Sequence, residues 1–122
     1  MKINPSKALL TLLLGLAVTL TLNAQTPKNF IGTWDQKAPD APGYETGKVV
    51  IEKQSVTSTF GENSYKYVAN QVKYKSDTLK FNMDVDDEYV KCYLVVKDKD
   101  NLTGFATWSS GETVLILTRT KE

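Results

Sequence analysis

Residues 29–36 read NFIGTWDQ and place Trp34 two residues after Gly32, at the start of a chain rich in strand-like patterns. A glycine lets two backbones approach closely, and a tryptophan fills a large volume. In a closed β-barrel the first strand pairs with the last, and one end has to be filled. We therefore expect Gly32 and Trp34 to close one end of a barrel. Arg119, near the end of the last strand, is the expected cation–π partner of the indole.

The first 24 residues have the pattern of a secretory signal peptide. Lys2 and Lys7 precede an uncharged apolar run over residues 8–22, and Ala24 is a small residue at the expected cleavage point. A membrane anchor is the alternative, but the run is shorter than the ~20 residues that a span needs. We expect residues 1–24 to be removed, residues 25–29 to form a short lead, and residues 30–122 to form one domain. The product would be exported, periplasmic or secreted, with no membrane anchor.

The composition excludes several classes of function. Without Lys2 and Lys7, 13 of the 15 basic residues remain against 14 acidic ones, so no strong field would attract nucleic acid. The chain has no histidine, which removes histidine-based catalysis and metal sites. Its one cysteine, Cys92, alternates with Val90 and Leu94 and is expected to be a buried, inert thiol. We expect a non-enzymatic protein without cofactor or metal, stabilised by its core alone.

Period-two alternation of apolar and polar residues dominates the rest of the chain. Leu79, Phe81, Met83 and Val85 alternate with polar residues, which is typical of a strand with one buried face. Turn-forming residues separate such segments. The expected strands are 30–36, 44–53, 55–60, 64–75, 77–85, 88–97, 101–109 and 112–120.

The expected strand 64–75 changes parity in its middle. Tyr65 and Tyr67 lie at odd positions, whereas Val72 and Tyr74 lie at even ones, which indicates a bulge or a break near residues 69–71. Eight short antiparallel strands leave two exposed edges, and closing the sheet removes them. The fold prediction is therefore all-β, an eight-stranded antiparallel up-and-down barrel.

An ordered set of short motifs resembles the lipocalin and calycin group, and within it small secreted bacterial lipocalin-like proteins. That group carries G-x-W on its first strand and an arginine packed across it from the last strand. The matching segments here are Gly32-Thr33-Trp34, Gly47-Lys48-Val49-Val50-Ile51, Asp77-Thr78-Leu79-Lys80-Phe81, Leu102-Thr103-Gly104 and Thr118-Arg119. The resemblance implies a lipocalin-like barrel and a binding function.

Residues 84–88 hold four carboxylates in five positions. They could bind Ca²⁺ through oxygen ligands, or one of them could pair with Glu45 or Glu52 in glycosidase-type chemistry. The spacing matches neither a calcium loop nor such a pair. A solvated hairpin turn is the favoured interpretation.

Aromatic residues next to turns mark a candidate ligand site at the barrel mouth. The loop 37–44 contains Pro39 and Pro42, which restrict it, and ends in Tyr44. Tyr65, Tyr67 and Trp108 lie near strand ends and would form an aromatic entrance if they converge. The alternative is that these three residues only pack the core.

Two classes of function follow from this pattern. The first is an exported binding module for a small apolar or amphipathic ligand. The second is a solid barrel that binds another protein or a second copy, as a periplasmic inhibitor or assembly factor, through an outer patch of Leu115, Leu117, Tyr93, Val95 and Phe105. A cavity of about 300 Å³ or more would favour a ligand. A filled barrel would favour a partner.

Export gives the first test. We expect the mature protein to begin at Gln25, because Ala24 ends the signal-peptide pattern. Intact mass spectrometry of the exported protein measures this directly. A product that keeps residues 9–22 would contradict the signal-peptide assignment.

Overall fold

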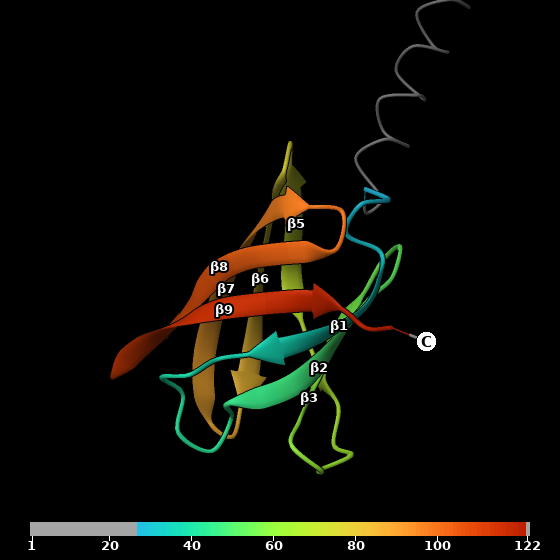
Figure 1. The fold of residues 1–122 in the computed structure, drawn as a ribbon. Coiled ribbons are helices and arrows are strands. Elements are labelled where there is room, and N and C mark those ends of the chain that lie inside the picture. Colours follow the sequence, from blue (N-terminus) through green and yellow to red (C-terminus); the bar gives the residue numbers. More distant parts are fainter. Residues whose placement is uncertain (1–26, 122) are drawn as a thin grey trace, which may run out of the picture.

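The computed structural model describes residues 27–121 and shows an all-β protein (Figure 1). The expected signal peptide and residues 25–26 of the lead lie outside the described residues. The strands are β1 (Gly32–Lys37), β2 (Thr46–Ile51), β3 (Val56–Phe60), β4 (Tyr67–Val68), β5 (Asn70–Lys75), β6 (Thr78–Val85), β7 (Glu88–Asp98), β8 (Asn101–Trp108) and β9 (Gly111–Arg119). Across residues 27–121 no helix is long and apolar enough to span a membrane.

The nine strands form one antiparallel sheet in the order β4-β3-β2-β1-β9-β8-β7-β6-β5. The first and last strands pair with each other, with Trp34 opposite Arg119 and Gln36 opposite Leu117. Curling brings the two ends of the sheet together, so that β4 contacts β6. The result is a nearly closed antiparallel barrel with one seam that lacks a backbone ladder (Figure 1).

The prediction of eight strands was wrong by one, because the segment 64–75 breaks into β4 and β5 at Ala69. The expected parity change lies at this break. Gln71 has a φ of 51°, and the register against β6 shifts between Asn70 and Lys73. The left-handed residue turns the chain and lets Tyr67 and Val72 both face the core side.

The alternating strands bury the faces expected of them. Leu79, Phe81 and Met83 on β6 are buried, as are Val49 and Ile51 on β2. These side chains belong to a single core cluster inside the barrel. Period-two patterning therefore predicted the inner face of β6.

One expected face was wrong. Leu115 and Leu117 on β9 were assigned to an outer patch, but both are buried, whereas Val114 and Ile116 are almost half exposed. Side chains on a strand alternate between its two faces, and Arg119 fixes which face of β9 points inward, because its side chain lies over the inward-facing Trp34. Residues two and four positions before Arg119 must then face inward as well.

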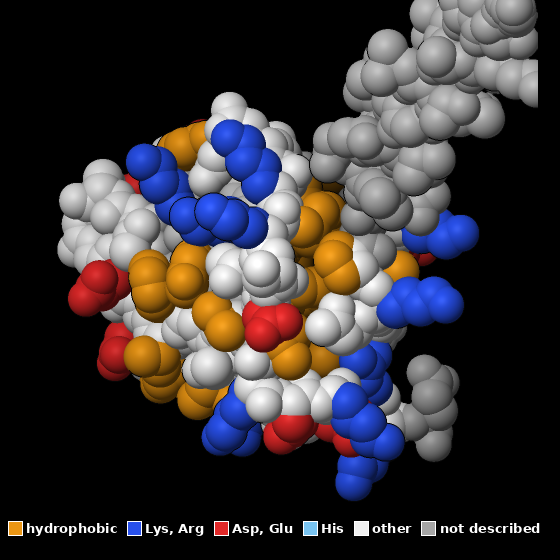
Figure 2. All heavy atoms as spheres, turned by 90° about the horizontal axis from the view of Figure 1, so that it is seen from above, with side chains coloured by type: hydrophobic (Ala, Val, Ile, Leu, Met, Phe, Trp, Pro, Cys, Tyr) orange, Lys and Arg blue, Asp and Glu red, His pale blue; other side chains and the backbone are white. Residues whose placement is uncertain are grey.

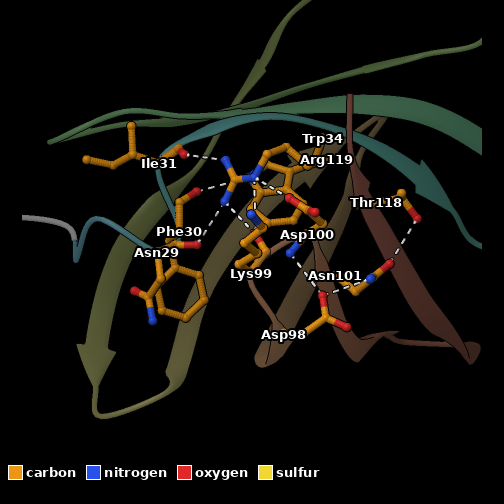
Figure 3. A network of polar contacts seen from close by, with 10 residues as sticks. All are labelled: Asn29, Phe30, Ile31, Trp34, Asp98, Lys99, Asp100, Asn101, Thr118 and Arg119. Carbon is orange, nitrogen blue, oxygen red and sulfur yellow. Dashed lines mark hydrogen bonds and ion pairs between the residues drawn. The ribbon is translucent and has the colours of Figure 1, made fainter. Parts of the chain in front are cut away.

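Trp34 fills the end of the barrel where the chain enters. The indole is fully buried, and its Nε1 donates to the carbonyl oxygen of Phe30 at 3.0 Å. The guanidinium of Arg119 lies 4.3 Å from the ring centroid, so the expected cation–π contact is present (Figure 3).

The Arg119 guanidinium also joins three segments of backbone. It donates to the carbonyl oxygens of Ile31 at 2.8 Å and Asn29 at 3.4 Å, and to that of Lys99 at 2.9 Å (Figure 3). Asp100 lies 3.4 Å from Nε. One side chain thus ties the chain entry and the β7–β8 turn to the last strand.

Gly32 leaves room for this arginine. Its φ is +143°, and a Cβ at this position would lie 2.5 Å from Nη1 of Arg119. Any other residue would be strained in the backbone and would also displace the guanidinium. The glycine and the tryptophan of the opening motif therefore serve the same closed end.

Loss of the Trp34 side chain should remove much of the stability. We expect Trp34→Ala to cost about 3–5 kcal/mol of unfolding free energy, as for large aromatics deleted from cores. Arg119→Ala should cost about 1–2 kcal/mol, since it loses the cation–π contact and hydrogen bonds at a partly exposed site. Chemical denaturation measures both, with Trp108→Ala as the matched control at the other end of the barrel. Equally small losses for all three variants would contradict the assigned closure.

Candidate functional site

The barrel contains a cavity of about 190 Å³ in the half nearest the β1–β2 loop. Its lining is mainly apolar. The lining residues are Gln36, Ala38, Ala41, Pro42, Tyr44, Phe60, Met83, Val85, Asp86, Glu88, Val90, Cys92, Ala106, Trp108, Thr113 and Leu115. This volume is smaller than the 300 Å³ that the sequence-based criterion required, yet the barrel is not filled.

The opposite half is solid. The largest fully buried side chains, including Trp34, Phe30, Leu79 and Leu117, do not line the cavity. The barrel therefore divides into a packed end around Trp34 and a hollow end under the β1–β2 loop. The hollow end is the candidate site.

The loop between β1 and β2 is an ordered cover for this end. The Ala38 amide donates to the Glu45 carbonyl at 2.8 Å, and the Tyr44 amide donates to the Ala41 carbonyl at 2.8 Å. The Asp40 amide donates to Thr113 Oγ1 on β9 at 3.0 Å. These bonds hold Ala38, Ala41 and Tyr44 against the cavity.

A carboxylate and two tyrosines join the mouth across the seam of the barrel. Asp86, in the β6–β7 turn, accepts a hydrogen bond from the Tyr44 hydroxyl through Oδ2 and one from the Tyr67 hydroxyl at 2.8 Å through Oδ1. We call these three residues the tyrosine clasp. It links the β1–β2 loop, β4 and the β6–β7 turn at the place where β4 and β6 have no ladder.

The clasp shifts the acidity of its members. The two hydroxyl bonds hold the pKa of Asp86 below its usual value. The bond to Asp86, helped by desolvation, raises the pKa of Tyr67 to about 12 and also raises the pKa of Tyr44. The clasp is therefore intact with an ionised aspartate and neutral tyrosines.

The acidic stretch 84–88 contains a hairpin turn, as favoured from sequence: Asp86 and Asp87 are the two-residue turn between β6 and β7. Asp86 and Asp87 have φ values of 50° and 74°, and Val85 pairs with Glu88. In the residues that the structure describes, no cluster of three or more carboxylates or thiols is placed to hold a metal ion. The turn instead supplies the clasp carboxylate.

The structure places the expected ligand residues in two groups. Tyr44, Pro42 and Trp108 line the cavity. Tyr67 is buried in the clasp behind Phe60, and Tyr65 is 62 % exposed with its ring against Tyr67. Pro39, in the same loop as Pro42, is exposed and is not among the lining residues of the cavity.

Sequence reasoning missed several lining residues. Phe60 packs edge-on against Tyr44 with ring centroids 5.1 Å apart. Gln36 lies two residues after Trp34 on the same strand face, so the alternation of β1 could have identified it. Asp86 had no such signal, because its partners lie 19 and 42 residues away.

Cys92 faces the cavity as a poor nucleophile. Burial raises the pKa of its thiol to about 12. The thiol is therefore protonated at neutral pH, in keeping with the expected inert cysteine. What the cavity offers is apolar surface, two carboxylates near its mouth and the amide of Gln36.

Comparisons with known proteins support the barrel and nothing finer. No family model and no curated protein matches the chain. A solved structure of a redesigned beta barrel matches with a TM-score of 0.60 and 16 % sequence identity, over 76 % of this chain and 93 % of the designed one. At this identity the likeness shows the fold alone.

The clasp predicts a pH-dependent contribution to stability. The folded-state pKa of Tyr67 is raised, so its bond stabilises fully below the usual tyrosine pKa of about 10 and is lost as the pH rises towards 12. We expect Tyr67→Phe to unfold at lower denaturant than wild type from about pH 6 to 9. The difference should shrink above about pH 10.

The control for this experiment is Tyr65→Phe, because Tyr65 is exposed next to Tyr67. Its midpoint should follow that of the wild type at every pH. A wild-type advantage over Tyr67→Phe that stays constant up to pH 12 would contradict the hydroxyl–carboxylate bond.

Proposed function

We propose that the protein is a lipocalin-like binding protein that holds a small apolar ligand in the cavity below the β1–β2 loop. The observation that carries this proposal is the cavity of about 190 Å³ in a barrel whose other end is fully packed. A packed core normally leaves few voids larger than a water molecule. This apolar space opens at the mouth, so a small molecule can enter it and cover apolar surface that the empty protein leaves exposed inside the barrel.

The size of the cavity limits the ligand. An apolar cavity of about 150 Å³ is large enough to bind benzene. The space here therefore suits one ring or a short branched chain, and it is smaller than the pockets that hold drug-sized molecules. Tyr44, Phe60 and Trp108 supply flat surfaces for such a group.

Binding is a better proposal than catalysis. The sequence has no histidine, the one thiol is protonated at neutral pH, and Asp86 is occupied by two tyrosine hydroxyls. The proposed export and the lipocalin-like class rest on the signal-peptide pattern and on the contact between Trp34 and Arg119.

A second candidate function is protein binding through the outer face of β7–β9. Phe105, Val114 and Ile116 are each more than 40 % exposed, and Phe105 stacks on Tyr93 at 5.0 Å. Phe105 and Val114 are opposite each other in the ladder. The outer patch of Phe105, Val114 and Ile116 replaces the one expected around Leu115 and Leu117. Seen from above, the face in Figure 2 carries hydrophobic side chains among Lys, Arg, Asp and Glu.

Toluene is a suitable first probe of the cavity because it is one apolar ring. We expect it to shift the indole N–H resonance of Trp108, which lines the cavity, and to leave that of Trp34 at the packed end unchanged. Ala106→Leu should weaken binding at least tenfold, since the larger side chain fills part of the cavity.

The matched control is Thr107→Leu, on the next residue of β8, whose side chain lies on the opposite face. This variant should bind toluene as the wild type does. If wild-type protein gives no toluene-dependent shift up to saturation of the aqueous probe, the ligand proposal fails, and the outer face of β7–β9 becomes the favoured site.

A further inference from the structure

Gln36 is a buried amide in a mainly apolar cavity. It lies on β1 between Trp34 and Ala38, its side chain is on the inner face, and it is only 8 % exposed. Its neighbours in the ladder are Gly47 on β2 and Leu117 on β9, neither of which has a polar side chain. The amide therefore meets the cavity rather than another polar residue.

Within residues 27–121, the side-chain amide of Gln36 forms no hydrogen bond. The other oxygen-bearing side chains of the lining are all engaged. Tyr44 donates to Asp86, Glu88 accepts from Ser109 at 2.9 Å, and Thr113 Oγ1 accepts from the Asp40 amide. Among the described residues of the lining, the Gln36 amide and the indole N–H of Trp108 thus have free hydrogen-bonding capacity. Of the two, only the amide offers both donors and an acceptor, two N–H groups and one carbonyl oxygen.

The Gln36 amide is not among the buried polar atoms that lack a partner, so it is accessible from the cavity that the residue lines. A polar group of a ligand in the cavity can therefore reach it. The amide is accordingly a candidate for recognising a polar group on the ligand. A hydroxyl, amide or carbonyl oxygen would satisfy it.

The charges around the cavity exclude one class of ligand. The lining contains two carboxylates, Asp86 and Glu88, and no lysine or arginine. Asp86 remains ionised, because its two tyrosine bonds lower its pKa. A ligand carboxylate would be desolvated beside these groups with no cation to pair with it, which is unfavourable.

We infer that the cavity takes a compact apolar molecule with one uncharged hydrogen-bonding group, which the Gln36 amide binds, and that it rejects carboxylates. This inference rests on the proposed ligand-binding function and defines its ligand class. The apolar part lies against Met83, Leu115 and the aromatic side chains of the mouth. The polar group points to β1, towards the packed end at Trp34.

Three probes with the same ring separate these properties: toluene, benzyl alcohol and benzoate. The first has no polar group, the second has a neutral hydroxyl, and the third is an anion at neutral pH. The measurement is the dissociation constant of each probe from the Trp108 indole shift at pH 7. Wild-type protein should bind benzyl alcohol at least about tenfold more tightly than benzoate, as expected for an uncompensated buried charge.

The decisive variant is Gln36→Leu. It should raise the ratio of the benzyl alcohol constant to the toluene constant by about 5- to 10-fold, the loss expected for one net hydrogen bond. Gln36→Met gives the same test with an unbranched side chain, should the leucine variant fold poorly. Gln54→Leu, at an exposed turn, is the matched control and should leave the ratio unchanged.

Each outcome has a distinct meaning. If none of the probes binds, the proposed ligand function fails. If toluene and benzyl alcohol bind but both Gln36 variants leave their ratio unchanged, the cavity is a ligand site and the role of Gln36 is wrong. Benzoate binding equal to that of benzyl alcohol would overturn the exclusion of carboxylates.

Discussion

The contact of Arg119 with Trp34 is the constraint on which the rest of the barrel depends. It joins the last strand to the first, because the two residues are opposite each other in the β1–β9 ladder and the guanidinium lies 4.3 Å from the indole centroid. The same side chain binds the carbonyls of Ile31 and Lys99. With one end held in this way, Leu117 and its neighbours pack into a solid half, and the cavity lies towards the other end.

The second joint of the barrel is made by side chains instead of backbone. β4 and β5 are the ends of the sheet, and no ladder connects them. Asp86 closes this seam at the mouth by accepting hydrogen bonds from Tyr44 and Tyr67. Such bonds to an ionised carboxylate are stronger than neutral ones. The bond from Tyr44 also ties the β1–β2 loop to the β6–β7 turn, so closure of the seam supports the cover of the site, which Asp40 and Thr113 hold as well.

The proposed site shows the usual conflict between stability and binding. Filling the cavity with larger apolar side chains would bury more apolar surface and strengthen the empty protein. The chain instead keeps a space of about 190 Å³ with a buried amide at its β1 side and carboxylates near its mouth. These features are unfavourable for a purely structural core and appropriate for a small, uncharged ligand. They concern recognition, which the barrel fold by itself does not define.

The sequence by itself determined the all-β class, the inner face of an alternating strand such as β6 and the closed end, because alternation and the pairing of Trp34 with Arg119 are local or terminal signals. Leu115 lies an even number of residues before Arg119 and so shares its inward-facing side of β9. The sequence therefore held this information, although Leu115 was predicted to lie in an outer patch. Only the tertiary structure decided the rest. Asp86 meets tyrosines 19 and 42 residues away, and the vacancy beside Gln36 depends on how strands from the whole chain curl and pack. Neither a long-range hydrogen bond nor an unfilled volume produces a periodic pattern of residues in the sequence.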